Sequence, residues 1–82
     1  MDSETYKKLS YELFKLPVSF IGTGDAFELV IKNIDLRITH NGEKYLLEYT
    51  RHGSGDHIET VTVEHLSTVI TMVKIEIKGL FR

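Results

Sequence analysis

Hydrophobic residues over the first sixteen positions recur every three or four residues, which is the period of one face of an α-helix. They are Tyr6, Leu9, Leu13 and Leu16. Ser3 is a candidate N-cap, and Pro17 disfavours helical backbone at the residue before it. The pattern predicts a helix from Ser3 to about Leu16 with one apolar face to bury.

The next part of the chain predicts β-strands, because apolar and polar residues alternate. A short apolar run covers residues 18–21, and a longer alternating stretch begins after residue 26. Its apolar residues are first Phe27, Leu29 and Ile31, at odd positions, and then Ile34, Leu36 and Ile38, at even positions. A β-bulge at Lys32 and Asn33 would shift the phase and keep one long bent strand. A tight turn there would end one strand and begin another. We favour the bulge.

Asn41 and Gly42 predict a hairpin, because Asn-Gly suits the two positive φ angles of a two-residue type I′ turn. Such a turn brings apolar residues together on one face. The expected pairs are Ile38 with Tyr45, Leu36 with Leu47, Ile34 with Tyr49, and, elsewhere on the hairpin, His40 with Glu43 and Asp35 with Glu48.

Two periods compete in the last third of the chain. After a strand marked by Ile58, Val61 and Val63, the same valines and isoleucines fit both a helical stripe and a strand face. We predict a helix over residues 63–72 and a strand over residues 73–78. The predicted fold class is therefore α+β: an N-terminal helix packed on an antiparallel β-meander of four or five strands, with a C-terminal helix and a final strand.

A Gly-hydroxyl-Gly-Asp loop that leads into an extended run occurs twice, beginning at Gly22 and at Gly53. These are ordinary turn residues. If the chain bulges at Lys32, however, both loops lie at one end of the sheet, and their side chains form a candidate site for a small ligand or a divalent cation. The candidate residues are Thr23, Asp25, His52, Ser54, Asp56 and His57. A turn at Lys32 would send the loops to opposite ends.

Size and composition narrow the classes of function. The 82 residues suit one domain over residues 1–82, and a small core favours self-association. Ten basic against twelve acidic residues argue against nucleic-acid binding. The absence of cysteine fits a reducing compartment. Since no signal peptide or membrane-spanning segment is visible, we expect a cytoplasmic protein without membrane contact.

Catalytic and cofactor motifs are missing from the sequence. Ser54 lies directly between two glycines rather than in a Gly-x-Ser-x-Gly elbow. His52, Asp56 and His57 have no third imidazole at a spacing typical of metal sites. Glycine loops that hold phosphate normally open a helix, whereas these two precede strands. We therefore predict no enzymatic activity, no metal and no cofactor.

Four residues are candidates for an interaction surface. Tyr11 and Phe14 lie beside the apolar stripe of the first helix, and Leu80 and Phe81 lie near the end of the chain. The leading hypothesis is a small non-enzymatic protein-interaction module, acting as a homo-oligomeric accessory or regulatory protein. The alternative is ligand or divalent-cation binding between the 22–25 and 52–57 loops. A third class is nucleic-acid binding through Lys7, Lys8 and Lys15.

Overall fold

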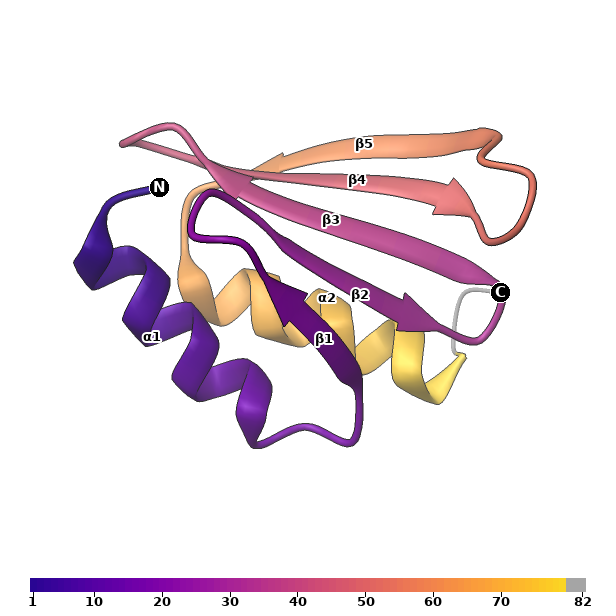
Figure 1. Cartoon of the computed structure of the whole chain (residues 1–82), viewed down its shortest axis with the longest axis horizontal. Coiled ribbons are helices and arrows are strands. Elements are labelled where there is room, and N and C mark those ends of the chain that lie inside the picture. Colours follow the sequence, from indigo (N-terminus) through magenta and orange to yellow (C-terminus); the bar gives the residue numbers. More distant parts are fainter. Residues whose placement is uncertain (80–82) are drawn as a thin grey trace.

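A computed structural model describes residues 1–79 and confirms the α+β class, with two helices and a five-stranded antiparallel sheet in this part of the chain (Figure 1). The elements are α1 (Ser3–Phe14), β1 (Ser19–Gly22), β2 (Phe27–Ile31), β3 (Ile34–His40), β4 (Tyr45–Arg51), β5 (His57–Val63) and α2 (Leu66–Lys78). The strands lie in the order β1-β2-β3-β4-β5, so each strand pairs with its neighbours in the sequence. The predicted meander is thus confirmed, with five strands.

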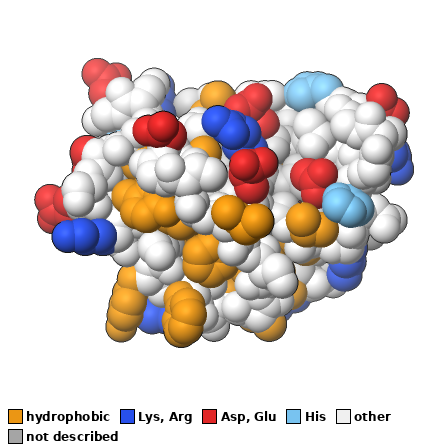
Figure 2. Space-filling view, in the orientation of Figure 1, with side chains coloured by type: hydrophobic (Ala, Val, Ile, Leu, Met, Phe, Trp, Pro, Cys, Tyr) orange, Lys and Arg blue, Asp and Glu red, His pale blue; other side chains and the backbone are white. Residues whose placement is uncertain are grey.

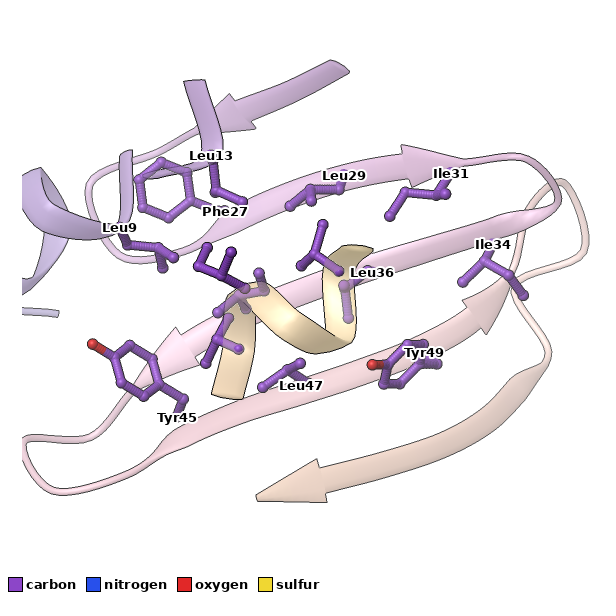
Figure 3. Close-up of a cluster of buried hydrophobic side chains, with 14 residues drawn as sticks. Leu9, Leu13, Phe27, Leu29, Ile31, Ile34, Leu36, Tyr45, Leu47 and Tyr49 are labelled. Atoms are coloured by element: carbon purple, nitrogen blue, oxygen red, sulfur yellow. The ribbon is translucent and has the colours of Figure 1, made fainter. Parts of the chain in front are cut away.

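The core lies between the sheet and the two helices, which both pack on the same face. Along β2, buried and exposed residues alternate, as expected for a strand with one covered side. Figure 3 shows the buried side chains of β2, β3 and β4 directed toward α2 and toward Leu9 and Leu13 of α1. The other face of the sheet carries no helix within residues 1–79. One open face is therefore left for other contacts.

The phase change in the alternating stretch is a turn, so the predicted bulge is wrong. Ile31 pairs directly with Ile34, and β2 and β3 run antiparallel on either side of Lys32 and Asn33. Lys32 has a φ of 55°, which is rare for a residue other than glycine. Lysine has no preference for a positive φ, so the alternation of apolar and polar residues alone does not distinguish a turn from a bulge.

Replacing Lys32 with glycine is expected to stabilise the protein by about 0.5–1 kcal/mol, because glycine adopts a positive φ without steric strain. Urea unfolding monitored by circular dichroism measures the change. Asn33→Gly is the matched control, because position 33 does not have a positive φ. Glycine there should bring no gain. Equal stability of the two variants would contradict the strain assigned to Lys32.

The β3–β4 hairpin forms at the predicted place but in a different register. Ile38 pairs with Leu47 and Leu36 with Tyr49, two residues away from the predicted alignment. The loop has four residues rather than two, since the Asn41 side-chain oxygen accepts the backbone N–H groups of Glu43 and Lys44, both at 2.9 Å. A shift of two preserves the side of the sheet that each residue faces. The apolar pattern is therefore equally satisfied by both registers.

The C-terminal prediction is partly wrong. The strand β5 extends to Val63, and residues 66–78 form one continuous helix, so no final strand exists over residues 73–78. The buried residues of α2 are Val69, Ile70, Val73 and Glu76, which is a helical spacing. Packing of this stripe on the sheet outweighs the preference of its valines and isoleucines for strands. The helix ends at Gly79, with a φ of 70°.

The N-cap of α1 is Asp2 rather than the predicted Ser3. Its carboxylate accepts the backbone N–H of Thr5 at 2.8 Å, and this hydrogen bond lowers the pKa of Asp2. Burial raises the pKa of the Tyr45 phenol, and the charge of Asp2 adds to the shift. The start of α1 therefore lies near the start of β4.

Candidate functional site

The two glycine loops lie at opposite ends of the sheet. Each hairpin reverses the chain, so the loop before β2 shares an end with the turn over residues 41–44, and the loop before β5 shares the other end with the Lys32 turn (Figure 1). Thr23 and Asp25 are consequently separated from the other predicted ligand residues, which are His52, Ser54, Asp56 and His57. The predicted shared site between the loops is wrong, because the turn at Lys32 adds one reversal.

The polar groups of each loop bond mainly within that loop. The Thr23 hydroxyl accepts the N–H of Ala26 at 3.2 Å, and the backbone N–H of Thr23 donates to the Ala26 carbonyl at 3.0 Å. In the second loop, the Ser54 hydroxyl accepts the N–H of Asp56 at 3.3 Å. These are turn-stabilising bonds. The same residue types serve two different turns, since Gly53 and Gly55 both have a positive φ, whereas Gly22 ends β1 and only Gly24 has a positive φ in the first loop.

The two loop histidines have separate partners. His52 Nδ1 lies 2.7 Å from a carboxylate oxygen of Asp35, and His57 Nε2 lies 2.8 Å from the hydroxyl of Thr60. Within residues 1–79, no three His, Asp or Glu side chains are arranged to hold a metal ion. His52 therefore links the second loop to β3, whereas His57 and Thr60 both belong to β5, so their contact lies within one strand.

The open face of the sheet carries a shallow hollow of about 490 Å³. Its apolar side is formed by Ile21 of β1 and Val30 of β2, with 69% and 48% of their surfaces exposed. Figure 2 shows hydrophobic side chains below the middle of this face, over β1, β2 and α1, and acidic, basic and histidine side chains above them. A mostly apolar surface thus borders a charged one.

The charged side of the hollow comes from β3 and β4. Arg37 pairs in register with Glu48, whereas Asp35 pairs with Thr50, so the predicted Asp35–Glu48 pair is wrong. The hydroxyl of Thr50 also approaches the Asp35 carbonyl oxygen, at 3.5 Å. Asp35 is further linked to His52 after the end of β4. Opposite charges side by side provide directional contacts for a partner placed over the apolar residues.

A second exposed apolar group lies on α1. Tyr11 and Phe14 expose 66% and 83% of their surfaces, and they line a hollow of about 340 Å³ with Lys7. The ammonium of Lys15 lies 4.2 Å from the centre of the Tyr11 ring. Its hydrogen bond with Glu12 raises the pKa of Lys15. The other two predicted contact residues, Leu80 and Phe81, lie outside the described residues.

The lysines proposed for nucleic-acid binding are mostly paired with acids of the same helix. Lys8 Nζ lies 3.5 Å from Glu4, and Lys15 Nζ lies 3.1 Å from Glu12. The outer face of α1 is therefore mixed in charge rather than uniformly basic, which does not favour a phosphate-binding surface.

The sequence predictions missed Ile21 and Val30 as candidate contact residues. The signal for Val30 was present, because it falls between Leu29 and Ile31, which face the core. A strand residue between two inward ones must face outward. Ile21 occupies the same outer face, since it pairs with Glu28 of β2.

Comparisons with protein-family models, with curated proteins and with solved structures find no match to this chain. Neither helix in residues 1–79 combines the length and apolar character needed to cross a bilayer.

Proposed function

We propose that this chain is a small protein-interaction module without enzymatic activity, acting as an accessory or regulatory protein that also self-associates. The contact surface for its partner is formed by Ile21 and Val30 on the open sheet face, and Tyr11 and Phe14 on α1, which packs on the other face, form a second contact surface. The observation that supports the proposal is the exposure of these four large hydrophobic side chains.

Folding leaves the apolar surface of these four side chains exposed to water, where a partner can bury it. Complete burial of a large hydrophobic side chain contributes roughly 1.5–3 kcal/mol. Most of this free energy is still to be gained when a partner buries Ile21 and Phe14, since 69% and 83% of their surfaces are exposed. Aromatic residues are also enriched at protein interfaces. Arg37 and Glu48, beside the apolar residues, would then fix the orientation of the bound protein.

A ligand or divalent-cation site between the glycine loops is not proposed further, because the loops lie at opposite ends of the sheet. The hollow of about 490 Å³ on the open face lies beside the exposed side chains of Ile21 and Val30, so a protein that covers these side chains would cover the hollow as well.

The test compares the wild-type chain with Ile21→Asp as baits in an extract of the native host. A charge at this exposed position should abolish retention of the partner and leave the fold unchanged, as checked by circular dichroism. Ser67→Asp is the matched control, because Ser67 is exposed on α2, which packs against the other face of the sheet. The proposal fails if wild type retains no protein, or if both variants retain the same proteins as wild type.

A further inference from the structure

The two edges of the sheet differ in how they are protected against pairing with another strand. At one edge, β1 has four residues and begins two positions after Pro17, and short strands with nearby proline are typical of guarded edges. At the other edge, β5 has seven residues without proline or lysine, and its protection is confined to its first half, where the register with β4 is irregular and Glu59 lies on the core side. Among the described strands, β4 is the only neighbour of β5. No strand within residues 1–79 therefore occupies the outer edge of β5.

The core is incompletely covered along this same edge. Val61 and Val63 are opposite Leu47 and Tyr45, which are buried, yet both valines are only half-buried. Ile58, near the start of β5, borders a hollow of about 340 Å³ whose other lining residues belong to the β2–β3 turn, to the end of β4 and to the end of α2, including Glu76. Met72, one helical turn before Glu76, shares that side of α2 and is also half-buried. Within residues 1–79, apolar side chains thus continue to the β5 edge and stay partly exposed there.

We propose that β5 pairs antiparallel with β5 of a second copy of this chain, so that the two sheets become one across a twofold axis. The regular part of β5 covers Glu59–Val63, because the register with β4 is interrupted between Tyr49 and Thr50. The middle of this segment is Val61. Placing the axis there sets Val61 opposite Val61 of the second copy.

The segment is self-complementary in this register. Thr60 is opposite Thr62 of the second copy, and Glu59 is opposite Val63, so no two carboxylates face each other. The two Val61 side chains then lie side by side on the core face, between the two α2 helices, and each Val63 lies opposite the exposed Glu59 of the other copy. Each copy thus supplies the apolar cover that the other lacks. This inference deepens the self-association part of the proposed function and does not depend on the open face.

The test uses Val61→Cys in a chain that contains no other cysteine. Opposite residues of an antiparallel pair have Cα atoms about 4.5–5.5 Å apart, which is within the range of a disulfide. Mild oxidation should therefore convert most of the variant into a covalent dimer on a non-reducing gel. Light scattering of the wild-type protein should give twice the chain mass of 9.4 kDa.

Ser19→Cys is the matched control, because Ser19 is exposed on the other edge strand, β1. It should remain monomeric on the gel under the same oxidation. A wild-type mass of 9.4 kDa at all concentrations overturns the proposal. So does a dimer in which Ser19→Cys cross-links as well as Val61→Cys does. Neither outcome affects the Ile21→Asp comparison, so failure of this inference is distinguishable from failure of the partner surface.

Discussion

Replacing Leu47 with alanine is expected to destabilise the protein by about 2–5 kcal/mol, the range for a leucine removed from a packed core. Leu47 is fully buried in β4 and pairs with Ile38 on one side and Val61 on the other. Its loss leaves a cavity between the sheet and the helices. Because a chain of 82 residues has little stability in reserve, a large part of the population should unfold at 37 °C.

Leu46→Ala provides the matched comparison, because Leu46 precedes Leu47 in the same strand and faces the open side of the sheet. Its side chain is only half-buried, so the expected loss is about 1 kcal/mol. Urea unfolding of both variants, followed by circular dichroism, gives the two free energies. Equal losses would contradict the assignment of the core to one face.

Gly22→Ala is expected to cost about 1–3 kcal/mol through overpacking. A methyl group at position 22 would overlap the hydroxyl of Tyr6 and come within 2.8 Å of Cε1 of Phe27. These two rings stack with their centres 4.5 Å apart, and Phe27 is almost completely buried. The added carbon must therefore displace an aromatic pair that joins α1 to β2.

The double variant Gly22→Ala with Tyr6→Phe separates overpacking from any other effect of alanine at this turn. Removing the Tyr6 hydroxyl takes away the closest contact, so the alanine should cost less in the Tyr6→Phe background than in the wild type. Thermal unfolding of the four proteins completes the cycle. Additive losses would show that the Tyr6 hydroxyl does not limit the space at Gly22.

The sequence was sufficient to predict the architecture, because apolar spacing reports directly on which side of an element is buried. The register between strands is harder to predict from the sequence. Shifting the β3–β4 hairpin by two residues keeps Leu36 and Leu47 on the core side, so only the geometry of the Asn41 loop selects the observed alignment. The bounds of α2 differ from the predicted 63–72 because its valines and isoleucines locally satisfy both the helical and the strand period. Packing against the sheet, whose strands are distant in sequence, favours the helix over the strand.

The candidate site was harder to predict than the fold. Its proposed location depended on the direction of every strand between the two glycine loops, and one unrecognised turn at Lys32 reversed the answer. Turn residues with positive φ are usually glycine, asparagine or aspartate. Here the adjacent Asn33 fits that preference, yet the positive φ belongs to Lys32. The sequence also does not predict that Ile21 is exposed, because this depends on which side of the sheet the helices cover.

The turn at Lys32 also determines the electrical polarity of the molecule. An odd number of strands returns the chain to the end at which β1 finishes, so α2 starts beside the loop that follows β1. At this same end, α1 starts near β4 (Figure 1). The dipoles of the two helices consequently add, whereas a four-stranded meander would have opposed them. One end of the protein gathers the partial positive charge of two helices, and the carboxylate of Asp2 at the start of α1 lies where it offsets part of that charge.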